Sequence, residues 1–200
     1  MKVLLGLISF TIAVIAGEAL MCKQCLDKRA DDCQGESVIC DLPGGMCAKG
    51  IEHNILNGDV VPTAFRACTN DTRLCGGQVS LSTAPFQLLL YTECCQEDDC
   101  NCGEIIMPPK NTTKNGVVCR SCFTEGDYSC TDVSTIECTG NEAECIEFSG
   151  QAARPEEETM IYSYYGCVTK GVCQIGFGGL PGSVVYEQRV LECTPSIETN

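Results

Sequence analysis

The chain has 200 residues, 19 cysteines and a formal net charge of −14 at pH 7. This acidity argues against binding to nucleic acid or to an anionic membrane surface, because phosphate groups would be repelled. It permits a basic protein partner, although solubility alone accounts for a charge of this sign. Cysteine at about a tenth of the chain is typical of extracellular domains held together by disulfides.

The first 19 residues predict a secretory signal peptide. Lys2 supplies a basic start, Val3 to Ile15 form a mostly apolar run, and small residues precede the expected cleavage after Ala19. The run is too short to stay in a bilayer as a helix, which needs about 20 apolar residues. No later segment is long and apolar enough to span a membrane, and Thr194 to Asn200 lack the hydrophobic tail of a lipid-anchored protein. We therefore expect a secreted, extracellular protein without a membrane anchor.

Two similar series of eight cysteines divide the rest of the chain. They are Cys22, Cys25, Cys33, Cys40, Cys47, Cys68, Cys75 and Cys94, and then Cys119, Cys122, Cys130, Cys138, Cys145, Cys167, Cys173 and Cys193. Corresponding steps in the two series differ by at most one residue. Such a repeat predicts two tandem modules, the first over residues 20–102 and the second over 117–200. Domains of this size bury modest cores and often depend on cross-links, each worth about 2 to 4 kcal/mol.

The CxxC pair that opens each series has a second interpretation, which is zinc binding. Cys22 with Cys25, and Cys119 with Cys122, have the spacing of zinc ligands. Zinc requires reduced thiolates, whereas the secretory route is oxidising, and His53 is the single histidine that could complete a site. The sequence therefore predicts disulfides, with no metal and no other cofactor.

The segments between the cysteines predict strands joined by turns. β-branched and aromatic residues mark strands at 59–65, 86–91, 160–165 and 184–191. Asn57-Gly58 is a strong signal for a hairpin turn, and the glycine-rich segment 178–182 marks a looser one. Residues 103–116 contain two prolines and no cysteine, and predict a linker. Because no segment after the signal has capped helical periodicity, we expect a nearly all-β fold.

The residues Leu20-Met21-Cys22-Lys23-Gln24-Cys25 and the run Cys94-Cys95-Gln96-Glu97-Asp98-Asp99-Cys100-Asn101 resemble the two ends of urokinase-receptor-type three-finger domains. The resemblance covers the chain after the signal and implies an all-β, disulfide-rich fold of two tandem three-finger, or snake-toxin-like, domains. It also implies the disulfides Cys22–Cys47, Cys25–Cys33, Cys40–Cys68, Cys75–Cys94, Cys95–Cys100, Cys119–Cys145, Cys122–Cys130, Cys138–Cys167 and Cys173–Cys193. The second module lacks the last pair of the first, so we expect its C-terminal end to be less tightly held. Cys102 is left over, which suggests a free thiol, a mixed disulfide or a covalent dimer.

No group of residues predicts catalysis, and we expect the protein not to be an enzyme. A serine or cysteine nucleophile would need a base and an orienting group, and His53 is the single imidazole. The acidic runs 97–99 and 156–158 lack the alternating ligands and the glycine of an EF-hand calcium loop. Asn70 and Asn111 each begin an N-glycosylation motif and are candidate acceptors in a secreted chain.

Function is expected to lie in loops that a rigid scaffold presents. The candidate tips are 53–59 and 82–85 in the first module and 150–158 and 177–182 in the second. Each could equally be a turn without a binding role. The side chains singled out for contact with a partner are His53, Asn57, Arg154, Glu156, Glu157, Glu158, Phe177 and Leu180.

Two stretches carry a closer resemblance. Phe148-Ser149-Gly150-Gln151-Ala152-Ala153-Arg154-Pro155-Glu156 and Ile136-Glu137-Cys138-Thr139-Gly140 resemble the sodefrin precursor-like factors, a family of secreted amphibian courtship pheromones with two three-finger modules. This resemblance implies a pheromone-like protein ligand that binds a chemosensory receptor. The cysteine pattern also resembles the gamma-type phospholipase A2 inhibitors of serum. Inhibition of a secreted phospholipase A2 is therefore the alternative function.

Overall fold

The computed structural model describes residues 19–195, so the expected signal peptide lies outside the described residues except for Ala19. The elements in chain order are β1 (Met21–Lys28), β2 (Glu36–Ile39), β3 (Met46–Leu56), β4 (Asp59–Thr69), the 3-10 turn η1 (Thr72–Leu74), β5 (Gly77–Ser82), β6 (Phe86–Cys95), β7 (Lys114–Glu125), β8 (Ser134–Thr139), β9 (Glu144–Ala153), β10 (Met160–Val168), α1 (Val172–Ile175) and β11 (Val184–Thr194). No helix within these residues is both long and apolar enough to cross a membrane.

The long hairpin of β3 and β4 forms the centre of the first module. Leu56 lies opposite Asp59, and Asn57 and Gly58 between them have φ angles of 53° and 88°. Positive φ at both central positions is what a type I′ turn requires, and Asn-Gly adopts it readily. The turn that the sequence predicts therefore sets the register of this hairpin.

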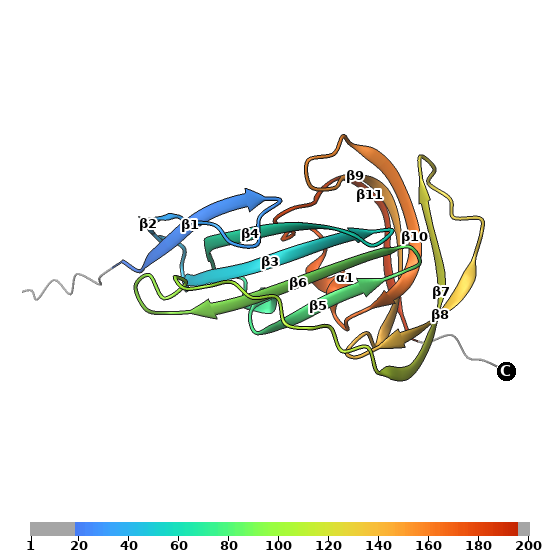
Figure 1. The fold of residues 1–200 in the computed structure, drawn as a ribbon, viewed down its shortest axis with the longest axis horizontal. Helices are drawn as coiled ribbons and strands as arrows, with labels where there is room; N and C mark the ends of the chain where they lie inside the picture. The colour runs from blue at the N-terminus through green and yellow to red at the C-terminus, as the bar shows by residue number, and fades with distance from the viewer. Residues whose placement is uncertain (1–18, 196–200) are drawn as a thin grey trace, which may run out of the picture.

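The strands pair antiparallel, and the expected all-β fold of two tandem three-finger domains is confirmed. The strand order is β11-β9-β10-β5-β6-β3-β4-β1-β2, and β7 pairs with both β10 and β8. The modules join where β5 pairs with β10, with Leu81 opposite Val168 and Ser82 opposite Cys167. Figure 1 shows the strands of the second module crossing the ends of the strands of the first.

Disulfides lie within each module, and none of those among residues 19–195 joins one module to the other. The bonded pairs are Cys22–Cys47, Cys25–Cys33, Cys40–Cys68, Cys75–Cys94, Cys95–Cys100, Cys119–Cys145, Cys122–Cys130, Cys138–Cys167 and Cys173–Cys193. Cys102 is the free cysteine of the described chain and is exposed.

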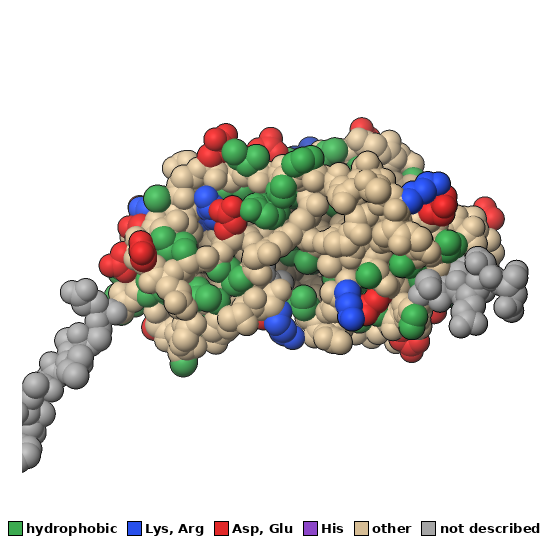
Figure 2. Space-filling view, turned by 90° about the horizontal axis from the view of Figure 1, so that it is seen from below, with side chains coloured by type: hydrophobic (Ala, Val, Ile, Leu, Met, Phe, Trp, Pro, Cys, Tyr) green, Lys and Arg blue, Asp and Glu red, His purple; other side chains and the backbone are tan. Residues whose placement is uncertain are grey.

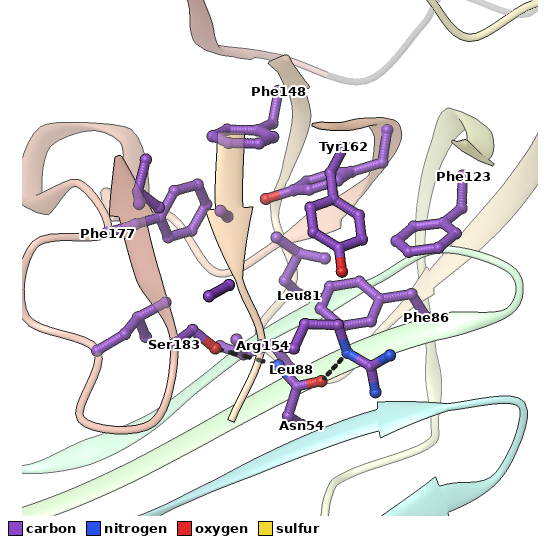
Figure 3. Close-up of a pocket in the computed structure, with 15 residues that line it drawn as sticks. Asn54, Leu81, Phe86, Leu88, Phe123, Phe148, Arg154, Tyr162, Phe177 and Ser183 are labelled. Carbon is purple, nitrogen blue, oxygen red and sulfur yellow. Dashed lines mark hydrogen bonds between the residues drawn. The ribbon is translucent and has the colours of Figure 1, made fainter. Parts of the chain in front are cut away.

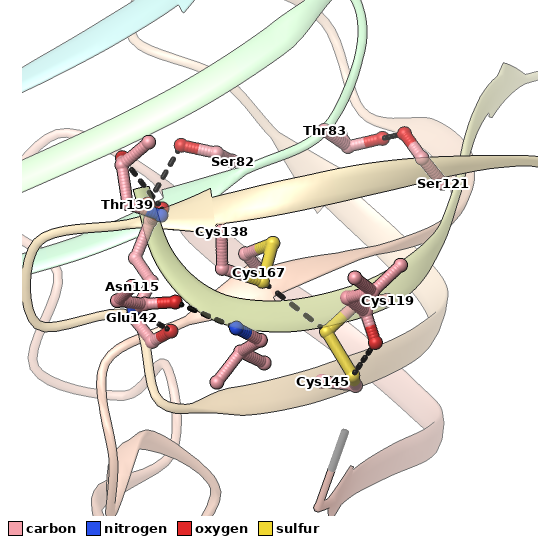
Figure 4. Close-up of a disulfide and its surroundings, with 12 residues drawn as sticks. Ser82, Thr83, Asn115, Cys119, Ser121, Cys138, Thr139, Glu142, Cys145 and Cys167 are labelled. Carbon is pink, nitrogen blue, oxygen red and sulfur yellow. Dashed lines mark hydrogen bonds between the residues drawn. A yellow bond between two sulfur atoms is a disulfide. The ribbon is translucent and has the colours of Figure 1, made fainter. Parts of the chain in front are cut away.

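Two disulfides of the second module lie against each other (Figure 4). The Sγ atoms of Cys119 and Cys138 are 3.3 Å apart, and the Sγ of Cys167 lies in the same cluster. Three sulfur atoms this close could suggest a metal site. All three are already bonded in disulfides, so none is available as a thiolate ligand.

Residues 103–113 pass from β6 to β7 along the first module. Ile105 is 6% exposed and packs in a cluster with Ile51. β7 begins at Lys114, inside the range 103–116 that the sequence predicts as a linker. The connection therefore buries apolar surface of the first module as well as joining the two modules.

Candidate binding groove between the two modules

The two modules share one apolar core (Figure 3). The Phe86 ring of the first module stacks on the Phe123 ring of the second, with centroids 5.2 Å apart. Within the second module, the Phe148 ring stacks on Tyr164 at 4.9 Å and meets Phe177 edge-on at 5.5 Å. The fully or nearly buried members of this core are Leu81, Phe86, Leu88, Ile146, Phe148, Tyr162, Tyr164, Val168, Val172 and Phe177.

This core corrects the expectation that 177–182 is an exposed binding tip. Phe177 is only 6% exposed, and Leu180 packs against the same cluster. In a module standing alone, a glycine-rich turn at the end of a hairpin would face solvent. In the structure Phe177 and Leu180 pack against apolar side chains of both modules, because apolar side chains gain free energy by leaving water, while Gly178 and Gly179 between them are exposed.

The segment 82–85, also expected to be a tip, contacts the second module instead. The Ser82 hydroxyl donates to Glu142 Oε1 at 2.7 Å (Figure 4). The Thr83 hydroxyl donates to the Cys122 carbonyl at 3.0 Å. Lys110 Nζ pairs with the same Glu142 oxygen at 2.8 Å. Glu142 is 1% exposed, and these donors compensate the burial of its charge.

A buried carboxylate on β3 binds the second module from the other side of the junction. Glu52 accepts hydrogen bonds from the Gly182 backbone N–H at 2.9 Å and from the Ser183 hydroxyl at 2.7 Å. Burial raises the pKa of Glu52, and these hydrogen bonds oppose the rise. A Cβ on Gly182 would lie 2.6 Å from Thr63 Oγ1, so only glycine allows this close approach.

Asn54 and Arg154 extend this polar contact toward the surface (Figure 3). Asn54 Nδ2 donates to the Ser183 hydroxyl at 3.1 Å, and Arg154 Nε donates to Asn54 Oδ1 at 2.7 Å. Arg154 Nη1 pairs with Glu157 Oε1 at 3.2 Å. The Arg154 side chain is 10% exposed, so it is a structural bridge between the modules rather than the free tip residue expected from the sequence.

A groove of about 600 Å³ opens beside Arg154, between the β3–β4 hairpin and the β9–β10 loop. We call it the intermodule groove. It is lined by Arg29, Leu56, Asn57, Asp59, Val60, Val61, Pro62, Arg154 and Glu157. At its edge Arg29 Nε pairs with Glu156 Oε2 at 2.6 Å, which joins the first module to the second.

The structure thus brings together only some of the residues singled out in the sequence. Asn57, Arg154 and Glu157 line the groove, and Glu156 lies beside it. Arg29 could not be found from the sequence, because its position in the groove depends on the contact between its loop and Glu156, which forms only in the folded chain. A positive φ of 67° at Arg29 marks the tight bend that turns it there.

His53 does not belong to the groove lining. Its Nε2 lies 3.8 Å from Asp31 Oδ1 and has no hydrogen-bond partner among residues 19–195. Burial lowers the pKa of His53, and the Asp31 charge partly offsets this. The His53 side chain is 20% exposed, so it is less accessible than the contact residue at a tip that the sequence predicts.

The remaining candidate residues are exposed and lie apart from the groove lining. These are Asn70, Asn111, Cys102 and Glu158. On the face shown in Figure 2, acidic side chains are spread along the outline of the molecule, with lysine and arginine side chains between them. The net negative charge is therefore not gathered into one patch on that face.

No family model matches the chain. The chain is 32% identical to Protein RoBo-1 of Rattus norvegicus over 83 aligned residues. This alignment covers 42% of this chain and 33% of RoBo-1. Over 86 residues the chain is 29% identical to the urokinase plasminogen activator surface receptor of Bos taurus, which covers 42% of this chain and 25% of the receptor. The chain is therefore similar in sequence, over part of its length, to the urokinase plasminogen activator surface receptor and to RoBo-1.

The matched regions span about a third and a quarter of these two relatives. A crystal structure of mouse TEX101 aligns with 88% of this chain and 98% of that chain, at 15% identity and a TM-score of 0.33. The assignment to the three-finger type therefore rests on the sequence matches and on the all-β, disulfide-bonded architecture described above.

Proposed function

We propose that this protein is a secreted, non-enzymatic ligand that binds another extracellular protein at the intermodule groove. The observation that carries the proposal is the groove, which is open and combines side chains of both modules. Binding residues are often carried by loops that a rigid scaffold holds in position. Here the ion pairs Arg29–Glu156 and Arg154–Glu157 hold such loops. The bovine relative is a surface receptor of urokinase plasminogen activator, which supports a protein partner.

The partner is a chemosensory receptor, and the protein acts as a pheromone-like signal. This part of the proposal depends on the resemblance of residues 148–156 to the sodefrin precursor-like factors. That stretch begins at Phe148, which is 2% exposed in the shared core, and reaches the groove at Arg154 and Glu156. It therefore joins the scaffold to the candidate contact surface.

A matched pair of charge reversals tests the proposal. Glu157 lines the groove, whereas its neighbour Glu158 is exposed and has no ion pair within the described part of the chain. Glu157→Lys should weaken activation of chemosensory tissue by about tenfold, as loss of a central contact does. Glu158→Lys should change it by less than about twofold, because peripheral charges contribute little.

Three results would contradict the proposal. The two variants could lose activity equally, or neither could lose any, and then the groove is not the contact surface. Stoichiometric inhibition of a secreted phospholipase A2 by the unaltered protein, without a chemosensory response, would establish the alternative function. Near-ultraviolet circular dichroism of both variants verifies that each retains the native fold.

A further inference from the structure

The outer edge of β4 is only partly covered by β1. The two strands pair as far as Lys28 opposite Thr63. The next bond along this edge runs from the Arg29 N–H to the Pro62 carbonyl at 2.7 Å, and there the chain turns away at the positive φ of Arg29. β4 itself extends three residues further toward the turn, to Asp59. In Figure 1, β1 accordingly ends well before the tip of the β3–β4 hairpin.

The backbone of Val60 is left open on this edge. The N–H and C=O groups of alternate residues point to the same side of a strand, so those of Val60 point as the Pro62 carbonyl does, toward the line that β1 has left. On its other side Val60 lies opposite Ile55 of β3, in a pair that the alternation leaves without hydrogen bonds. Among residues 19–195, none pairs with Val60 on the outer side. One N–H and one C=O therefore face the space beyond Lys28.

This open edge forms one wall of the intermodule groove. Residues 59–62 line the groove on the side of the first module, and Arg154 and Glu157 line it on the side of the second. Val60 is 50% exposed, so an aliphatic side chain is uncovered beside the open backbone. One residue of an extended strand takes about 3.4 Å along the chain, 4.8 Å between strands and 10 Å between sheets, which is about 160 Å³. The groove of about 600 Å³ therefore has room for about four such residues.

The charges at the groove are unevenly paired. Arg29 pairs with Glu156, and Arg154 pairs with Glu157, so both cations are already matched. Asp59 lines the groove, is exposed and forms no ion pair within the described part of the chain. The free charge at the groove is therefore negative, as is the net charge of −14. A lysine or arginine of an occupant finds a partner at Asp59 and is attracted by the molecule as a whole.

We propose that the groove binds an extended segment of another protein as an added β-strand, and that this segment carries a lysine or arginine flanked by aliphatic residues. The segment continues the line of β1 along β4 and exchanges hydrogen bonds with the N–H and C=O of Val60. In this mode main-chain hydrogen bonds supply affinity, and contacts with alternate side chains supply specificity. The inference rests on the proposed function, which places a protein partner in the groove, and adds how that partner is held.

The test uses the whole secreted protein, isotope-labelled for nuclear magnetic resonance, and two synthetic peptides. One peptide is acetyl-Thr-Val-Lys-Val-Thr-amide, and the other has glutamate in place of the lysine. Titration gives both dissociation constants, and amide hydrogen exchange at Val60 is followed in the same samples. The lysine peptide should bind about two- to fivefold more tightly, as an exposed ion pair allows. At about 90% saturation, exchange at Val60 should slow about tenfold, because only the unbound tenth remains open.

Two pairs of variants make the test specific. Val60→Pro removes the N–H without removing a bond to β3, and Pro62 shows that this edge accepts proline. It should weaken binding of the lysine peptide about five- to tenfold, whereas Val60→Thr keeps the N–H and the branched shape and should change it less than about twofold. Asp59→Asn should abolish the difference between the two peptides. Glu158→Gln removes an equal charge from an exposed residue outside the groove lining and should leave that difference unchanged.

Strand addition is overturned if neither peptide binds, if both bind equally, or if binding leaves exchange at Val60 unchanged. It is equally overturned if Val60→Pro and Val60→Thr bind alike. Should Val60→Pro fail to be secreted, exchange at Val60 in the unaltered protein decides the outcome.

The failure of strand addition is distinguishable from the failure of the proposed function. If the peptides do not bind, but Glu157→Lys loses the chemosensory response and Glu158→Lys keeps it, the groove is the contact surface and only strand addition is wrong. If the peptides bind as expected and both of these variants keep the response, the strand site stands and the pheromone-like function is wrong.

Discussion

The burial of Phe177 makes a prediction that separates a packed turn at 177–182 from a free tip. Phe177→Ala removes a ring that is 6% exposed and meets Phe148 edge-on. A buried aromatic side chain covers about 150 to 250 Å², and at about 25 cal/mol per Å² this corresponds to an upper bound of about 4 to 6 kcal/mol. Large-to-small replacements of buried phenylalanine cost about 3 to 5 kcal/mol. We expect a loss in that range.

The assay is thermal unfolding under non-reducing conditions, followed by near-ultraviolet circular dichroism. For a chain of this length, a loss of 3 to 5 kcal/mol lowers Tm by roughly 6 to 20 °C. Tyr186→Ala on β11 is the control, because Tyr186 is 63% exposed. It should change stability by less than about 0.5 kcal/mol. If Phe177→Ala behaves like Tyr186→Ala, the turn at 177–182 is a free tip.

Three further predictions concern charge and cross-links. The folded-state pKa of Glu52 is raised above 4.5, so the stabilising contribution of Glu52 is complete below that pH and is lost as pH rises through the folded pKa. In urea unfolding, Glu52→Gln should therefore be more stable than the unaltered protein at pH 8 but not at pH 4. A difference in stability that does not change with pH would contradict this. Cys40→Ser opens a loop of 28 residues at a cost of about 2 to 4 kcal/mol and should abolish secretion, whereas the exposed Cys102→Ser should be secreted normally; equal loss of secretion in both would refute the assignment of Cys102 as free. Non-reducing peptide mapping should find no disulfide between residues before 103 and after 116, and one such bond would disprove the two-module arrangement.

The all-β class and the central hairpin could be predicted from the sequence because both depend on residues close together in the chain. A two-residue turn needs positive φ at Asn57 and Gly58, and few other residue pairs satisfy that requirement. Likewise, β-branched and aromatic runs favour extended backbone wherever they lie. The strand expected at 59–65 continues to Thr69 in the structure. Residues 66–69 pair with β3 there, although their composition does not by itself favour a strand.

The contact between the modules could not be predicted in the same way. A glycine-rich turn has the same composition whether it faces solvent or another sheet. What buries Phe177 is the surface formed by Leu81, Leu88 and Phe148, which comes from three separate strands. One signal was nevertheless available, namely two large apolar residues, Phe177 and Leu180, in a single loop of an acidic protein. Soluble monomers rarely expose large contiguous apolar patches, so two large apolar residues this close together favour a covering surface within the chain or outside it.

The contacts between the modules also determine which part of the candidate site is free to recognise a partner. The segments 82–85 and 177–182 hold the modules together, so most substitutions there cost stability before they alter recognition. The turn at Asn57 and Gly58 and the run 156–158 contribute no side chain to the shared core and are exposed. Charge substitutions in the run 156–158 can alter the groove with little effect on stability, whereas the positive φ angles of Asn57 and Gly58 restrict the residues that the turn can accept. Differences in partner between proteins of this architecture should therefore arise where these two loops meet.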